Sequence, residues 1–163
     1  MKTTDELRRG ELARRVEEFR SAYQGRDVEG MLALFADDAE VIMAPGAFRG
    51  KAAIRKFWEW EVRMVPVAGS SDTGLGMVVV GRSVVWERRV SATVEGVPYT
   101  TGAVTILEFD HAGLIRCYRS YYDKLGEMEK IASGMSGVYG WFARKLVGYL
   151  VAQGKKGLDT SSV

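Results

Sequence analysis

The stretch VEEFRSAYQGRDVEGMLALFADDAEV, residues 16–41, contains the pattern that decides the fold. Apolar residues spaced by three and four positions predict an amphipathic helix over residues 5–24, with Leu12, Val16, Phe19 and Tyr23 on its buried face. Asp27 stands where an N-cap is needed for a second, shorter helix. We expect this second helix to end near Asp37 and Asp38, so that the two helices form a hairpin.

The chain continues with one more strand and one more helix before strands become dominant. A short strand is expected over residues 40–43, a third helix over 51–65, and a Gly-, Ser- and Thr-rich loop over 69–76. Later β-branched and aromatic runs predict an antiparallel meander at 77–80, 84–93, 98–109 and 114–122. Helices followed by a meander indicate an α+β domain in which helices cover one face of a curved sheet.

The C-terminal residues 131–163 are expected to form a helical extension and tail on the domain of residues 1–130. Large apolar residues beside Arg144 and Lys145 also fit a helix lying on a membrane surface. Packing on the domain itself or on a second subunit is favoured, because the apolar arc is broad. The tail over 158–163 is expected to be frayed.

Composition excludes several classes of protein. The 163 residues, 47% hydrophobic and 27% charged, suit one domain that needs no disulfide or metal to fold. The chain has one cysteine, Cys117, and one histidine, His111, which argues against an internal disulfide, a zinc site and a metal-dependent enzyme. A net charge of +2 argues against nucleic-acid binding. Without a secretory leader or 18 consecutive apolar residues, the protein is expected to be cytoplasmic.

Three stretches resemble the SnoaL-like branch of the nuclear transport factor two-like superfamily. They are residues 16–41, FRGKAAI at 48–54 and RCYRSYYD at 116–123, within a resemblance that spans roughly residues 8–130. The resemblance implies a cone-shaped α+β fold, in which a bent antiparallel sheet wraps three helices around a deep apolar pocket. It also implies a homodimer formed through the outer face of the sheet. Because this cone hosts isomerases, cyclases, hydrolases and binding modules, the resemblance implies little about the reaction.

Catalytic positions of two enzyme groups in this superfamily are mostly replaced here. Where the resemblance places the tyrosine and the aspartate base of ketosteroid isomerases, the chain has Phe19 and Met43. A thioether cannot accept a proton, so that mechanism is not supported. Limonene-epoxide hydrolases are similar as well, but of their five catalytic groups only the relay arginine is kept, as Arg88. The other four positions fall on Val41, Met43, Val90 and Ser120.

Arg88 is the one charged residue on an otherwise apolar strand face. Alternation along residues 84–93 places it with Val84, Trp86, Val90 and Ala92. A buried guanidinium needs a partner, because an unpaired buried charge is costly. Two interpretations are open: a structural ion pair, or an anchor for a substrate oxyanion or carboxylate.

Glu61 is the corresponding exception on the third helix. It projects from the middle of the inward stripe formed by Ile54, Phe57, Trp58, Val62 and Val65. Burial would raise the pKa of this carboxyl group toward the range useful for proton transfer, whereas a neighbouring Arg88 would lower it. A proton-transfer role, a structural ion pair and a solvent-facing glutamate all remain open.

The first functional hypothesis is a cofactor-independent enzyme, of polyketide cyclase or isomerase type, acting on an apolar carbonyl-bearing molecule. Glu61 would move the proton, and Arg88, assisted by Tyr118 or Ser120, would hold the developing oxyanion. The expected binding surface consists of Phe19, Met43, Trp58, Trp86 and Val90. One alternative is an epoxide hydrolase or cyclic-ether-forming relative with a rearranged acid pair. Another is a non-catalytic, ligand-binding dimeric scaffold.

Overall fold

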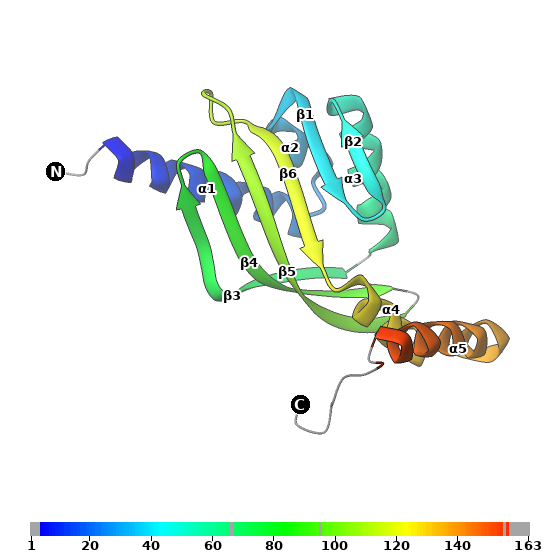
Figure 1. The fold of residues 1–163 in the computed structure, drawn as a ribbon. Helices are drawn as coiled ribbons and strands as arrows, with labels where there is room; N and C mark the ends of the chain where they lie inside the picture. The colour runs from blue at the N-terminus through cyan, green and yellow to red at the C-terminus, as the bar shows by residue number, and fades with distance from the viewer. Residues whose placement is uncertain (1–3, 66, 95, 155, 157–163) are drawn as a thin grey trace.

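The computed structural model of the chain describes residues 4–65, 67–94, 96–154 and 156. Helices cover one face of a curved sheet, and two more helices follow the last strand (Figure 1). The predicted α+β architecture is confirmed. The tail predicted over 158–163 lies outside the described residues.

Among the described residues, one sheet contains six strands in the order β2-β1-β6-β5-β4-β3. The strands are β1 (Phe35–Met43), β2 (Gly46–Arg49), β3 (Val67–Val80), β4 (Ser83–Val94), β5 (Val97–Phe109) and β6 (Ile115–Tyr122). The pairs β3–β4, β4–β5 and β5–β6 are antiparallel, so the predicted meander is confirmed. β1 joins β6 in parallel and thereby brings the N-terminal half of the chain onto the meander.

Three helices pack against this sheet around the core: α1 (Thr4–Gln24), α2 (Val28–Ala33) and α3 (Lys51–Met64). The periodic apolar residues Val16 and Phe19 of α1 are almost completely buried, as their spacing predicts. Asp27 caps α2, since its carboxylate accepts a hydrogen bond from the amide of Gly30 at 2.9 Å. These contacts confirm the predicted helical hairpin.

The predicted end of the second helix near Asp37 and Asp38 is wrong. α2 ends at Ala33, and both aspartates lie in β1. The carbonyl of Leu34 accepts a hydrogen bond from the amide of Ile115 at 2.8 Å, which joins the chain to β6 immediately after the helix. Burial of Phe35 on this strand makes the extended conformation more favourable than another helical turn.

The predicted loop over 69–76 is also wrong, because this segment belongs to β3. Its residues pair with β4 from Val67 opposite Thr93 to Asp72 opposite Arg88, and pairing resumes at Met77. Between these two parts the strand contains a bulge, with Gly74 and Gly76 at φ 52° and 60°. Polar and glycine-rich composition suits β3 because it is an edge strand of the sheet.

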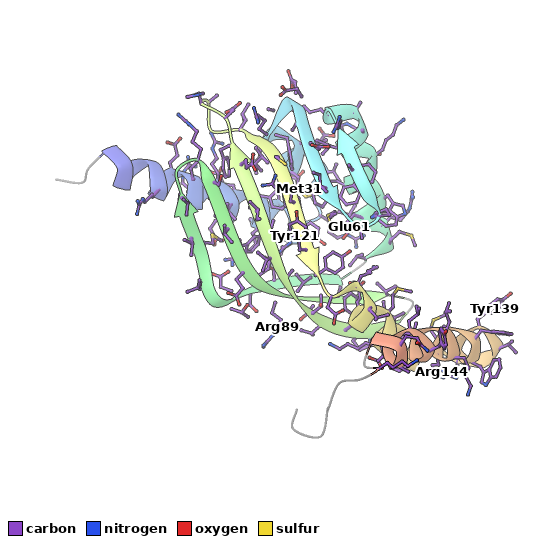
Figure 2. All side chains as sticks on the ribbon, in the orientation of Figure 1. Met31, Glu61, Arg89, Tyr121, Tyr139 and Arg144 are labelled. Carbon is purple, nitrogen blue, oxygen red and sulfur yellow. The ribbon has the colours of Figure 1, made fainter. Side chains whose placement is uncertain are left out.

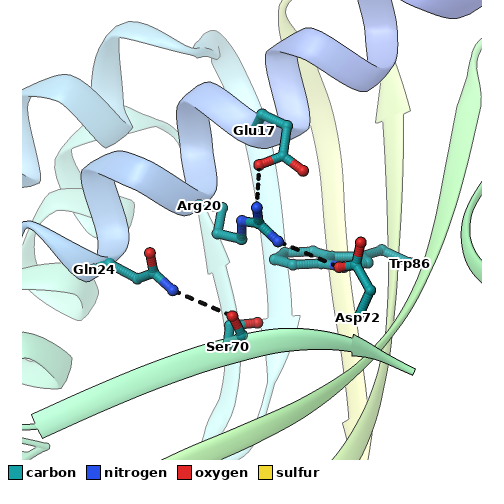
Figure 3. A network of polar contacts seen from close by, with 6 residues as sticks. All are labelled: Glu17, Arg20, Gln24, Ser70, Asp72 and Trp86. Atoms are coloured by element: carbon teal, nitrogen blue, oxygen red, sulfur yellow. Dashed lines mark hydrogen bonds and ion pairs between the residues drawn. The ribbon is translucent and has the colours of Figure 1, made fainter.

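A polar network fastens α1 across this edge (Figure 3). The Asp72 carboxylate accepts hydrogen bonds from Trp86 Nε1 at 2.9 Å and from Arg20 at 3.3 Å. Gln24 donates to the carbonyl oxygen of Ser70 at 3.3 Å. The buried indole of Trp86 therefore obtains its acceptor from β3.

The last two helices are α4 (Lys124–Gly134) and α5 (Gly137–Gly154). α4 begins at the N-cap Asp123 and packs on β5 so closely that a Cβ at Gly134 would lie 2.6 Å from Val97 Cγ1. α5 contacts α4 and extends beyond the sheet (Figure 1). The expected domain boundary between residues 130 and 131 falls inside α4.

Only Gly140 and Val147 of α5 are buried. A stripe of large apolar side chains on the opposite side is exposed: Val138, Tyr139, Phe142, Leu146, Tyr149 and Leu150. Tyr139, 85% exposed, projects from the end of α5 that is far from the sheet (Figure 2). No helix in the described part of the chain is both long and apolar enough to cross a membrane.

Candidate functional site

A cavity of about 200 Å³ lies between α3, the strands β4 to β6 and α4. Its wall is mostly apolar and aromatic, with Met43, Trp60, Val90 and Ile131 among the contributors. Nine polar side chains also line it: Tyr23, Glu61, Arg88, Tyr99, Thr101, Ser120, Tyr122, Lys124 and Glu127. An apolar cavity with a few convergent polar groups is the usual form of a small-molecule site.

The structure brings most of the candidate site residues to this cavity, although not all of them. Glu61, Arg88, Ser120, Met43 and Val90 line it. Tyr118 is connected to the wall through its hydrogen bond to Arg88. Three expected binding residues do not line it, and each is at most 1% exposed within the core: Phe19, Trp58 and Trp86. Those three side chains lie in the core behind the cavity wall.

Glu61, labelled in Figure 2, lies on α3. Its side chain is half-buried and lines the cavity. The Tyr23 hydroxyl donates a hydrogen bond to Glu61 Oε1 at 3.3 Å. Burial raises the pKa of the Glu61 carboxyl above its ordinary value, while the hydrogen bond from Tyr23 and the positive charges of Lys124 and Arg88 oppose this rise. Glu61 is therefore a cavity carboxyl group whose affinity for a proton is increased, and its predicted inward orientation is confirmed.

Arg88 is 5% exposed and is held by two aromatic residues. Its Nη2 donates to the Tyr118 hydroxyl at 3.1 Å, and its guanidinium carbon lies 4.3 Å from the centre of the Trp86 ring. Its Nε has no hydrogen-bond partner among the described residues. Within the described part of the chain, no ion pair within 4.0 Å joins Arg88 to Glu61. The structural ion pair considered from the sequence is not formed.

Ser120 is buried, and its hydroxyl lies 3.1 Å from that of Thr105 on the neighbouring strand. The chain's single histidine, His111, lies in the β5–β6 turn, where Nδ1 is 2.8 Å from Arg82 Nη2. Ser120 therefore has no histidine base, and its position suits hydrogen bonding to a ligand better than nucleophilic attack.

Glu127 on α4 is a site residue that the sequence reasoning missed. Its side chain is 5% exposed, and Oε1 lies 3.2 Å from the ammonium nitrogen of Lys124. Its other oxygen, Oε2, has no hydrogen-bond partner among the described residues. Burial, followed by the negative charge of Glu127 and a hydrogen bond between the two side chains, raises the pKa of Tyr99. Burial, followed by the negative charge of Glu127, raises the pKa of Tyr122 to about 12. The α4 side of the cavity therefore contains a carboxylate among neutral phenols.

The sequence contains only faint signals for Tyr23 and Glu127. The helical spacing of the first helix places Tyr23 in the core stripe, and nothing in that spacing indicates that its hydroxyl reaches Glu61. Glu127 precedes Ile131 by one helical turn, a weak hint that both face inward. Among the described residues, no three His, Cys, Asp or Glu side chains cluster as metal ligands do.

Comparison with protein families gives a match to the SnoaL-like domain over residues 16–118, which is more than half of the chain. The chain belongs to the SnoaL-like domain family. This match begins in α1 and ends in β6, so the SnoaL-like domain includes Glu61, Arg88 and Tyr118. No curated protein matches the chain.

Solved structures resemble the SnoaL-like domain at low sequence identity. One, from Shewanella denitrificans and named as a SnoaL-like polyketide cyclase, is 15% identical, with a TM-score of 0.67 over 75% of this chain and 97% of its own. Another, from Catenulispora acidiphila, has a ketosteroid isomerase-like fold and was crystallised with trimethylamine. It is 19% identical, with a TM-score of 0.64 over 71% of this chain and 90% of its own. A third, from Sinorhizobium meliloti and named as a polyketide cyclase, is 22% identical, with a TM-score of 0.55 over 66% and 93%. At these identities the likeness shows the fold.

Proposed function

We propose that the protein is a cofactor-independent enzyme of cyclase or isomerase type, acting on an apolar molecule that carries a carbonyl group. The observation that carries this proposal is the presence of Glu61 and Arg88 on one cavity without an ion pair between them. A carboxyl group with a raised pKa and a guanidinium with an unpartnered N–H provide a proton carrier and an oxyanion donor.

In the proposed reaction, the Glu61 carboxylate removes a proton from the carbon next to the substrate carbonyl. The electron pair of that C–H bond forms a carbon–carbon double bond, the π pair of the carbonyl group moves onto its oxygen, and Arg88 Nε donates a hydrogen bond to the resulting enolate. In an isomerisation of a β,γ-unsaturated ketone the anion is a dienolate, and Glu61 returns the proton to its γ-carbon. In a cyclisation, the enolate carbon attacks a second carbonyl of the same molecule, and the Glu61 carboxyl protonates the new alkoxide. Tyr118 and Trp86 position the guanidinium throughout.

The wall of the cavity supports a small, largely apolar substrate. A cavity of roughly 150 Å³ in another protein is large enough for benzene, so about 200 Å³ suits a single-ring ketone. Met43, Val90 and Ser120 line the cavity. In the proposed complex the first two would supply apolar contact, and the Ser120 hydroxyl would orient the carbonyl. The names of two structural neighbours as polyketide cyclases support ketone chemistry of the polyketide kind.

The test is exchange of α-protons in D2O, measured by NMR with acetophenone and 2-tetralone. We expect exchange above the uncatalysed rate, and a loss on the order of 100-fold or more in Glu61→Gln, because general acid–base catalysis contributes at least this much. Glu59→Gln, an exposed glutamate on the same helix, is the matched control. Unchanged exchange in Glu61→Gln would exclude the proton-carrier role. Ketone binding by the wild type without exchange would favour the non-catalytic binding protein.

Glu127 favours one second candidate, an epoxide hydrolase. The cavity holds two carboxyl groups, Glu61 and Glu127, with Arg88 on the same wall. One of the two groups, as a carboxylate, would take a proton from a water molecule while the water oxygen attacks an epoxide carbon. The other group, protonated at the start, would donate its proton to the epoxide oxygen as the ring opens. Formation of a diol from styrene oxide, abolished in both Glu61→Gln and Glu127→Gln, would support this reaction over proton exchange.

We also propose that the protein is a homodimer. The resemblance implies pairing through the outer face of the sheet. The stripe on α5 adds a second apolar surface, in which Tyr139, Phe142, Leu146 and Tyr149 follow the three- and four-residue spacing of helix-packing seams. Sedimentation should give about twice the 18.1 kDa of one chain. Leu146→Glu would separate the copies if α5 forms the contact, and a wild-type monomer at micromolar concentration would exclude the dimer.

A further inference from the structure

Two charged side chains reach the cavity with one polar atom each left unsatisfied. Arg88 and Glu127 are each 5% exposed, and both line the cavity. Among the described residues, Arg88 Nε has no acceptor and Glu127 Oε2 has no donor. Buried polar atoms normally have a partner, so an unsatisfied donor and an unsatisfied acceptor on two side chains that line one cavity indicate a ligand that supplies both.

The charges around Glu127 determine what kind of donor fits. Lys124 already neutralises the carboxylate through Oε1 at 3.2 Å. Arg88 adds a second positive charge to the wall, and Glu61 adds a second carboxyl group. With Glu61 ionised, as the proposed proton transfer requires, these four charges balance. An ammonium group would add an unbalanced charge, so a neutral O–H is the donor that matches Oε2.

We propose that Glu127 Oε2 accepts a hydrogen bond from a hydroxyl group of the ligand while Arg88 Nε donates to its carbonyl oxygen. Glu127 then determines specificity: the cavity selects a hydroxylated ketone over the same ketone without the hydroxyl. This inference rests on the proposed function, because it uses Arg88 as the carbonyl anchor. It adds a role for α4, which the proposed proton transfer does not use.

The size of the effect depends on the chemistry of the pair. A hydrogen bond to a charged group contributes more than one between neutral groups, and a ligand lacking it leaves a desolvated carboxylate oxygen without a partner. We expect the hydroxylated ketone to bind about tenfold to 100-fold more tightly than the unsubstituted one.

The experiment compares dissociation constants for acetophenone, its 3-hydroxy and 4-hydroxy derivatives and its 4-aminomethyl derivative, measured by calorimetry on the full chain. The better hydroxy isomer should bind at least tenfold more tightly than acetophenone, and the amine should show no such gain. In Glu127→Leu the ratio of the dissociation constant of acetophenone to that of the hydroxy isomer should fall to about one. Glu129→Gln, an exposed glutamate on the same helix, should behave as the wild type.

The wild-type series alone tests the inference if Glu127→Leu does not fold. Equal affinity for acetophenone and both hydroxy isomers would overturn it, and so would an advantage that persists in a folded Glu127→Leu. Tighter binding of the amine would assign Oε2 to a cationic ligand instead. Failure here with Glu61-dependent proton exchange intact would leave the proposed function standing. Selective binding of the hydroxyketone without any exchange of its α-protons would contradict the proposed function and leave the binding preference intact.

Discussion

Replacement of Arg88 decides whether this guanidinium stabilises the fold or is maintained for a ligand. The informative change is Arg88→Met combined with Tyr118→Phe, which removes the buried charge together with the hydroxyl that accepts its hydrogen bond. Methionine preserves much of the aliphatic volume beside the Trp86 ring. A substitution at Arg88 alone would leave the Tyr118 hydroxyl without its buried donor and would confuse the result.

Burial of Arg88 determines the sign of the change in free energy of unfolding. Arg88 is 5% exposed and has no carboxylate partner within 4.0 Å among the described residues, so it retains the cost of desolvation. The contacts that offset this cost are a cation–π contact worth about 2 kcal/mol when desolvated and a hydrogen bond from a charged group, worth about 1.5–3 kcal/mol. Replacement of buried charged groups by apolar side chains often stabilises a protein by about 1–4 kcal/mol. We therefore expect the double variant to gain about 1 kcal/mol or more in free energy of unfolding.

The assay is urea unfolding at pH 7, followed by circular dichroism, together with acetophenone binding. The double variant should have a higher midpoint with an unchanged m-value, and it should bind the ketone more weakly. A loss of about 3–5 kcal/mol is the signature of breaking a buried ion pair. That result would refute the reasoning and would show that Arg88 is structural.

Three further experiments test the packing and electrostatics described above. Burial raises the pKa of Glu61 in the folded state above 4.5, so protonated Glu61 stabilises the fold at low pH, and this contribution is lost as the pH rises through the raised pKa. The free energy of unfolding of Glu61→Gln relative to wild type should therefore increase over that pH window in urea titrations. A constant difference would contradict the raised pKa. Asp72→Ala should lower the free energy of unfolding by about 1–3 kcal/mol, because the Trp86 indole N–H loses its acceptor, whereas Asp72→Asn, which keeps an oxygen, should lose less. Gly134→Ala should reduce the melting temperature through the close approach of Val97, and Val97→Ala should restore it; failure of that rescue would show that the contact does not limit packing.

Periodicity predicted those parts of the site that lie on long regular elements. The alternation of apolar residues along β4 placed Arg88 on the buried face, and the helical spacing of α3 placed Glu61 inward. Both predictions needed only the period of one element. The same patterns do not predict how deep in the domain a side chain lies. Trp58 and Trp86 point inward as expected, but they lie in the core behind the cavity wall.

The errors came where tertiary contacts overrule composition. The segment 69–76 reads as a loop because it is rich in glycine and polar residues, yet pairing with β4 makes it a strand and supplies Asp72 to the Trp86 indole. Asp37 and Asp38 suggested the end of a helix, but the chain pairs with β6 on either side of them, at Phe35 and again from Glu40. Glu127 was not predicted because nothing within α4 shows that this helix folds back onto β5.

The family match ends at Tyr118, whereas the wall of the cavity continues through Tyr122, Glu127 and Ile131. Part of the cavity wall is thus encoded outside the residues that the family match covers. Two proteins that share every matched residue would still enclose differently shaped and differently charged cavities if the residues after their last strand differed. Exchange of this short piece of sequence between relatives is therefore expected to change the shape and charge of the cavity while keeping the fold.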